Sequence, residues 1–247
     1  MNPATFGDAK EVFSRIHKVA LKYPDVRLLI CPPSLYIMPL ASLRTKERTL
    51  TLGAQDTDWR DEGAHTGNIS SRMIKNAGAI GVIIGHSERR AEGEDDEIIN
   101  KKIARALREN LMVVFCFGER ERDDDGHYLR ILREQITVGL MKIPQSALKN
   151  ILFAYEPVWA IGKEGERAIN PHVLHEMVIF VRKVISELYP SYQTAHVRIL
   201  YGGSVSPENA GTLLKEGNVN GLLVGHKSLE IDDFTDIIIT THNHVAR

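Results

Sequence analysis

Short apolar runs alternate with longer amphipathic segments along almost the whole chain. The runs are too short for helices that stand alone, and they are apolar on both faces, which is typical of strands buried in a parallel sheet. The segments between them have the periodicity of helices that cover such a sheet, so the pattern predicts an α/β fold with a parallel sheet covered by helices. We predict strands at residues 26–31, 49–55, 81–84, 113–116, 151–155, 197–201 and 221–224. We predict helices at residues 4–22, 38–43, 70–77, 95–110, 128–140, 171–189 and 207–215, with 234–240 ending the fold.

The chain reads as one domain over residues 1–247, because 247 residues suit one α/β barrel and the sequence contains no linker-like stretch. Residues 241–247 are expected to form a disordered tail. The net charge of −1 argues against a nucleic-acid partner, and the apolar runs are too short to cross a membrane. No signal peptide is visible, and Cys31 and Cys116 are expected to be reduced thiols, so we expect a cytoplasmic protein.

The end of the strand at 151–155 carries the first candidate for catalysis. Glu156 stands where this strand should end, and Pro157 keeps it from continuing directly into a helix. The residues that follow, up to Gly162, are mostly apolar, which is costly for a loop exposed to water. We therefore predict a flap that closes over Glu156 and excludes solvent, although a turn with a surface glutamate would also fit this stretch alone.

Glycine clusters and one histidine follow other predicted strands. Glycines at 202–203 and 225 can let the backbone approach a ligand, and amides at a helix start can hold a phosphate. In a barrel, the loops after the last two strands are the usual phosphate site, although tight turns are the plainer explanation for each cluster alone. His86 follows the strand at 81–84 at the start of a helix, where positive partial charge favours a neutral imidazole.

Together these residues would place a carboxylate, a neutral histidine, a phosphate cradle and an apolar flap on one rim. A carboxylate can remove a proton next to a carbonyl, and a neutral imidazole can stabilise the enediolate that forms. This is the chemistry of an aldose–ketose isomerase for a small phosphosugar, with no cofactor and no metal. His242 and His244 are not expected to bind a metal ion, because a third metal ligand is missing.

At this point the sequence resembles the triosephosphate isomerase family. The motifs that carry the resemblance are in the family's order and spacing at residues 31–33, 53–56, 63–70, 85–90, 116–119, 154–162, 201–204 and 224–225. The resemblance implies a TIM (β/α)8-type barrel that interconverts D-glyceraldehyde 3-phosphate and dihydroxyacetone phosphate in glycolysis and gluconeogenesis. It also implies a homodimer formed through the loop from Gly63 to Gly67.

The resemblance also implies roles for individual residues. Glu156 is the implied base, His86 the electrophile, and Glu88 a carboxylate near them. The implied phosphate ligands are the backbone groups of Gly162, Ser204, Gly225 and His226. The pairing of a glutamate base with a neutral histidine is well known in this family and is not a new conclusion.

The sequence departs from the family pattern at four places, and three of them bear on the expected site. The family begins with a strand that ends in Asn-x-Lys before a Met-Asn pair, so Met1-Asn2 predicts that this strand and its lysine are absent. Two unpaired strand edges and weaker stabilisation of the transition state would follow. The flap differs at residues 162–168 and is expected to be one residue longer, and His226-Lys227 replace Gly-Ala at the phosphate turn.

These departures leave three alternatives open. The chain could isomerise a related tetrulose phosphate. It could instead be an impaired or non-catalytic barrel that binds phosphorylated metabolites. Translation from an upstream start would restore the strand and the lysine. A change at Asn68, where the family usually has glutamate, does not decide between them.

Overall fold

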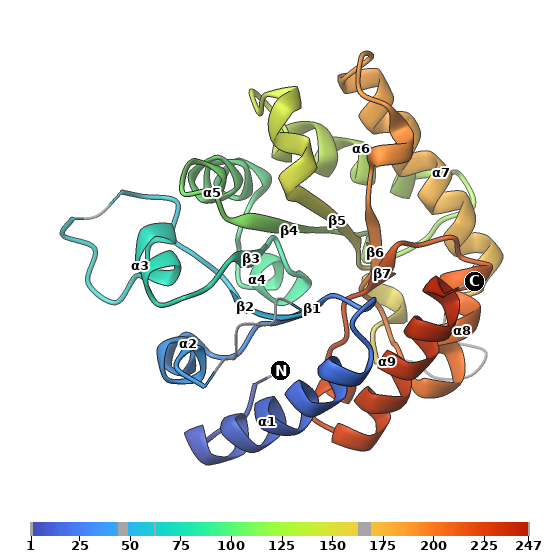
Figure 1. The fold of residues 1–247 in the computed structure, drawn as a ribbon. Coiled ribbons are helices and arrows are strands. Elements are labelled where there is room, and N and C mark those ends of the chain that lie inside the picture. Colours follow the sequence, from blue (N-terminus) through green and yellow to red (C-terminus); the bar gives the residue numbers. More distant parts are fainter. Residues whose placement is uncertain (1, 44–48, 62, 163–168, 247) are drawn as a thin grey trace.

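Seven parallel strands form one sheet at the centre of the molecule, and helices cover its outside (Figure 1). The structure is a computed structural model and describes residues 2–43, 49–61, 63–162 and 169–246. Neighbouring strands pair in chain order from β1 to β7, each pair parallel. The predicted α/β barrel class is therefore confirmed, with seven strands in the described residues.

The strands lie close to the predicted positions. They are β1 Leu28–Ile30, β2 Leu50–Ala54, β3 Gly81–Ile84, β4 Met112–Phe117, β5 Ile151–Tyr155, β6 Ile199–Tyr201 and β7 Gly221–Leu222. The α-helices are α1 Phe6–Lys22, α2 Ser34–Ala41, α3 Ser71–Asn76, α4 Ser87–Ala91, α5 Asp96–Arg108, α6 His127–Gly139, α7 Pro171–Leu188, α8 Pro207–Lys215 and α9 Ile231–Val245. Short 3-10 helices are η1 Gln145–Asn150, η2 Val158–Ala160, η4 Thr194–His196 and η5 His226–Ser228.

The structure corrects three expectations about helices. Helix α2 begins at Ser34, directly after Pro33, rather than at residue 38. Helix α4 was not predicted, since it is only one turn long and has no buried residue of its own. Residues 241–245, expected in a disordered tail, continue helix α9. There the imidazole of His242 contacts the ring of Tyr23, with the ring centroids 5.1 Å apart, which gives the helix end a tertiary contact.

Strands β1 and β7 stand at the two ends of the sheet order, so within the described residues each pairs on one side only. Helices α1 and α9 pack together beside these two strands, as the blue and red helices in Figure 1 show. Their apolar faces share one buried cluster with β1 and β2, which includes Phe13, Ile16 and Ile238. Helix packing thus joins the two ends of the sheet where strand pairing does not.

The central strands are apolar on both faces because each face meets a different layer. In β4, Val113, Phe115 and Phe117 pack toward the covering helices, while Val114 and Cys116 belong to a separate cluster. That second cluster joins them to Ala154 and to apolar side chains of the other strands, as expected for a filled barrel interior. No helix in the described residues is both long and apolar enough to span a membrane.

Candidate active site

Glu156 is a buried carboxylate at the carboxyl end of β5. Its side chain is 1% exposed, and Oε2 accepts a hydrogen bond from the backbone N–H of Ser87 at 3.0 Å. Among the described residues, the other oxygen, Oε1, has no hydrogen-bond donor. Burial raises the pKa of Glu156, while the nearby His86 and the Ser87 N–H partly oppose that shift. A carboxylate with one oxygen hydrogen-bonded to a backbone N–H and the other oxygen without a donor is suited to take up a proton.

Two glycines make room for Glu156, and both belong to turns after neighbouring strands. A Cβ atom on Gly118 would lie 1.7 Å from the carbonyl oxygen of Glu156, and one on Gly202 would lie 2.8 Å from its Cγ. The first contact is impossible, and the second would force the side chain of Glu156 to shift, so both positions favour glycine if Glu156 is to occupy its place. Residues 202–203 are predicted from the sequence to belong to a phosphate cradle, and the structure shows that Gly202 also bounds the carboxylate.

His86 lies beside Glu156 and caps the short helix α4. Its Nδ1 accepts a hydrogen bond from the backbone N–H of Glu88 at 3.4 Å. A ring nitrogen that accepts carries no proton, so in the neutral imidazole the proton is on Nε2. Nε2 lies 3.5 Å from Oε1 of Glu156. The structure therefore brings these two predicted residues together, with an N–H and a carboxylate oxygen facing the same space.

Glu88 occupies a different environment from the pair. Its side chain is 87% exposed, and Oε2 lies 3.8 Å from Nδ1 of His86, on the side of the ring away from Glu156. Glu88 thus contacts the pair only through the far edge of the imidazole.

The predicted phosphate residues lie in the turns after β6 and β7 and at the base of the flap. The hydroxyl of Ser204 donates to the carbonyl of Ala160 at 3.0 Å, which joins the turn after β6 to η2. A Cβ at Gly162 or Gly225 would meet no atom of the described residues within 4 Å, so among these residues the backbone there faces open space. The flap expected at residues 157–168 begins as the helix η2, and its residues 163–168 lie outside the described residues.

His226 and Lys227 point their side chains at carboxylates of α9 and the turn before it. The ring of His226 is 83% exposed and lies 3.3 Å from Glu230. Nζ of Lys227 lies 3.0 Å from Glu230 and 2.7 Å from Asp233, and these two carboxylates raise the pKa of Lys227. The backbone of His226 remains a candidate for phosphate contact, whereas the Lys227 ammonium is already paired.

A second buried carboxylate, Glu119, holds the base of the flap, a role that the sequence did not predict. Glu119 is fully buried after β4, and its Oε1 accepts hydrogen bonds from Tyr155 Oη at 2.8 Å, Trp159 Nε1 at 2.8 Å and Arg122 Nε at 3.1 Å. Its backbone carbonyl accepts from the N–H of Val158 at 2.9 Å. Its position after a strand was the signal that the sequence offered, since Glu119 stands shortly after β4 and Glu156 directly after β5. This cluster fixes Trp159, and with it the start of the flap.

Replacing Trp159 by phenylalanine is expected to lower the free energy of unfolding by about 2 kcal/mol, because a hydrogen bond to a buried carboxylate is lost. Urea unfolding followed by circular dichroism measures this. Trp59→Phe is the matched control, since that indole is 39% exposed and makes no described bond to a carboxylate. Equal losses in the two variants would show that the bond to Glu119 does not stabilise the flap base.

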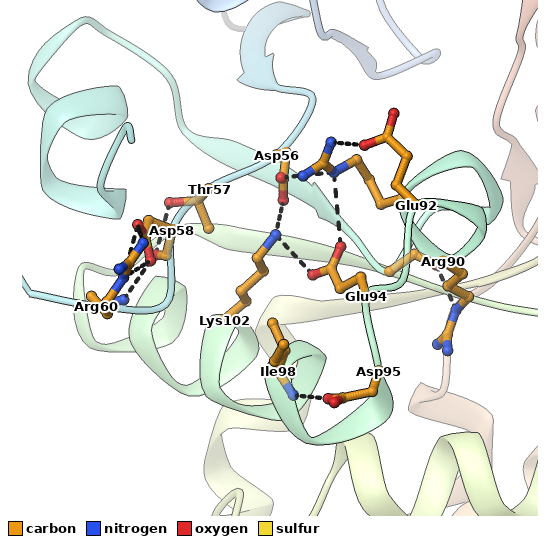
Figure 2. Close-up of polar contacts among 12 residues, drawn as sticks. Asp56, Thr57, Asp58, Arg60, Arg90, Glu92, Glu94, Asp95, Ile98 and Lys102 are labelled. Atoms are coloured by element: carbon orange, nitrogen blue, oxygen red, sulfur yellow. Dashed lines mark hydrogen bonds and ion pairs between the residues drawn. The ribbon is translucent and has the colours of Figure 1, made fainter. Parts of the chain in front are cut away.

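An ion-pair network lies next to α4, where Lys102 meets Asp56 and Glu94 (Figure 2). Lys102 of α5 is only 7% exposed, and its Nζ lies 2.6 Å from Asp56 and 2.8 Å from Glu94. Arg89 of α4 joins the same two carboxylates, with Nε 3.1 Å from Asp56 and 3.9 Å from Glu94. The network ties α4 to the turn after β2 and to the start of α5, so it fixes the helix that His86 caps.

Changing Lys102 to methionine is expected to lower the free energy of unfolding by about 3 kcal/mol, because two largely buried carboxylates lose their closest cation. Thermal and urea unfolding provide the measurement. Lys101→Met, one residue earlier on the exposed face of the same helix, should change the free energy by about 0.5 kcal/mol or less. A small effect at Lys102 would mean that Arg89 alone satisfies both carboxylates.

Fold and site together define a class of protein. A parallel α/β barrel with a buried carboxylate beside an imidazole at the carboxyl ends of its strands has the arrangement of an enzyme that transfers protons. No group of His, Cys, Asp or Glu side chains in the described part of the chain could hold a metal ion.

Comparison with known proteins identifies the family. The family model described as triosephosphate isomerase matches residues 1–241. A triosephosphate isomerase of Geotalea uraniireducens (strain Rf4) is 39% identical over 237 residues, covering 95% of this chain and 93% of the relative. One from Bradyrhizobium sp. (strain ORS 278) is 42% identical over 214 residues, covering 85% and 82%. The crystal structure of triosephosphate isomerase from Bartonella henselae superposes with a TM-score of 0.81 at 34% identity, covering 93% of this chain and 92% of that one. The chain belongs to the triosephosphate isomerase family.

Proposed function

We propose that this protein interconverts D-glyceraldehyde 3-phosphate and dihydroxyacetone phosphate through an enediolate. The observation that carries the proposal is the position of Oε1 of Glu156. This oxygen is buried, accepts no hydrogen bond within the described residues and lies 3.5 Å from Nε2 of His86. A substrate that lies against both atoms would present a C–H to Oε1 of Glu156 and its carbonyl oxygen to Nε2 of His86. The family relationship supports this substrate pair, since the relatives of this chain carry the name triosephosphate isomerase.

The proposed reaction moves one proton between two neighbouring carbons. Oε1 of Glu156 takes the proton from the carbon beside the carbonyl, and the electron pair of that bond forms the carbon–carbon double bond of the enediolate. The negative charge that develops on the carbonyl oxygen is stabilised by the Nε2–H of His86. Return of the proton to the other carbon, with a proton exchanged between the two oxygens, yields the isomer. Glu88 acts on this pair only through the Nδ1 side of the ring.

The substrate phosphate is proposed to lie against the backbone of Gly162, Ser204, Gly225 and His226. The open space at Gly162 and Gly225 supports this placement. Because the Lys227 ammonium is paired with two carboxylates, it is not the cation that balances the phosphate charge. Phosphate binding in this chain would then depend on backbone N–H groups and on the flap.

The direct test is turnover of the purified chain with each triose phosphate, followed by a coupled assay in both directions. Isomerisation that is saturable and inhibited by 2-phosphoglycolate is the expected result. A tetrulose phosphate measured in parallel should show a lower kcat/KM. A protein that binds 2-phosphoglycolate but isomerises neither triose phosphate would instead be a non-catalytic binding barrel.

We further propose a single-domain, cytoplasmic enzyme of glycolysis and gluconeogenesis that works as a homodimer. The loop from Gly63 to Gly67 is the proposed dimer contact. It projects into solvent in this single chain, where Gly63, Ala64, Thr66 and Gly67 are all exposed. Sedimentation equilibrium should give twice the chain mass of 27.7 kDa, and Thr66→Asp should shift the measured mass toward that of a single chain.

A further inference from the structure

A basic cavity opens at the end of the barrel opposite to Glu156. It has a volume of about 850 Å³ and is formed by η1, which precedes β5, and by the segment around η4, which precedes β6. Glu156 follows β5, whereas the cavity residues come before that strand, so the strand's length of roughly 16 Å separates the two sites. The volume is within the range of small-molecule sites, about 300–1,000 Å³.

The lysine, histidine and arginine side chains that line this cavity are all basic, and its described lining residues include no carboxylate. They are Lys149, His196 and Arg198. None of the three takes part in an ion pair within the described parts of the chain. The chain offers no local carboxylate either, because residues 140–155 and 188–207 contain neither aspartate nor glutamate. Three positive or titratable groups around one cavity, with no acidic partner, favour an anionic ligand.

The cavity is also preorganised and has a flat apolar surface. Nη2 of Arg198 donates to the carbonyl of Lys149 at 2.5 Å, which holds the guanidinium at the cavity wall and joins η1 to the start of β6. The ring of Tyr192 lines the cavity and contacts His196 edge-on, with the ring centroids 6.1 Å apart. Arginine and lysine bind phosphate oxygens, and an aromatic ring offers a stacking surface for a planar base.

From these features we propose that the cavity binds a nucleoside phosphate. The base stacks on the ring of Tyr192 beside the methyl group of Ala195, and the phosphates contact Arg198, Lys149 and His196. A triose phosphate would fill only part of this volume and would leave the aromatic surface uncovered. The site is therefore distinct from the proposed isomerase site both in position and in the ligand class that it fits.

The test is calorimetric titration of the full chain with ATP and ADP while 2-phosphoglycolate saturates the active site. We expect a Kd below about 1 mM for ATP. Adenosine should bind at least about tenfold more weakly because it lacks the phosphates, and pyrophosphate more weakly because it lacks the base. Loss of ATP binding in the presence of 2-phosphoglycolate would place the nucleotide in the active site and overturn the proposal.

The double variant Lys149→Gln with Arg198→Gln should weaken ATP binding at least about tenfold. Arg130→Gln with Lys183→Gln is the matched control, since it removes the same charge from exposed positions on α6 and α7. Tyr192→Leu should weaken ATP binding but leave pyrophosphate binding unchanged, which tests the stacking surface without removing a cation. Isomerase turnover reports that each variant is folded. Equal ATP binding by the charge variant and its control would overturn the proposal, as would no binding by the unaltered chain.

Discussion

Replacing Glu156 by glutamine is expected to lower kcat by about 10²- to 10⁴-fold, because glutamine cannot accept the substrate proton. KM should change far less, since the amide has the same shape and can still accept the N–H of Ser87. The measurement is the steady-state rate with D-glyceraldehyde 3-phosphate. Glu97→Gln, at an exposed position at the start of α5, is the matched control and should keep the rate of the unaltered chain.

The same variant should be more stable than the unaltered chain at pH 7. Burial raises the pKa of Glu156 above its ordinary value of 4.5, so the folded protein binds this proton more tightly than the unfolded one. The contribution of Glu156 to stability is therefore full at low pH and falls as the pH rises from 4.5 through the raised pKa. The difference in Tm between Glu156→Gln and the unaltered chain should shrink toward pH 4. An inactive variant that is less stable at pH 7 would point to a structural role for Glu156.

Replacing His86 by glutamine is expected to lower kcat by about 10²- to 10³-fold, because the Nε2–H that would stabilise the enediolate oxygen is lost. The amide of glutamine is flexible, whereas the imidazole is fixed by the bond from the Glu88 N–H to Nδ1. Rates with both triose phosphates, together with the Kd of 2-phosphoglycolate, separate catalysis from binding.

His172→Gln is the control for His86, since His172 is exposed at the start of α7. It should leave kcat unchanged. A His86→Gln variant that loses affinity for 2-phosphoglycolate but keeps its kcat would mean that His86 positions the ligand rather than stabilising the enediolate.

Local sequence patterns predicted most of the fold because each strand is apolar on both faces. The runs at 81–84 and 151–155 match β3 and β5 at both ends. The short helix α4 was missed because its residues, 87–91, are polar and exposed and so carry no periodic signal. The sequence did not predict that residues 241–245 continue α9, because the contact of His242 with Tyr23 joins positions far apart in the chain.

The sequence predicted those residues of the candidate site whose place depends only on following a parallel strand. Glu156 and His86 follow parallel strands, and the carboxyl ends of such strands meet at one rim. Glu119 satisfied the same rule and was still missed, because its partners Tyr155 and Trp159 are 36 and 40 residues away in the chain. The pairing of Lys102 with Asp56, 46 residues apart, was hidden for the same reason.

The sequence by itself determined the alternation of strands and helices, and through it the parallel sheet that gathers Glu156 and His86 at one end. Only the tertiary structure decided that Glu156 is buried and keeps one oxygen free of donors. That result depends on Gly118, Gly202 and the Ser87 N–H, which come from three other strand–turn units. The alternation of strands and helices follows from local hydrophobic periodicity, whereas the burial and pKa of one carboxylate depend on neighbours that meet only after the chain has folded.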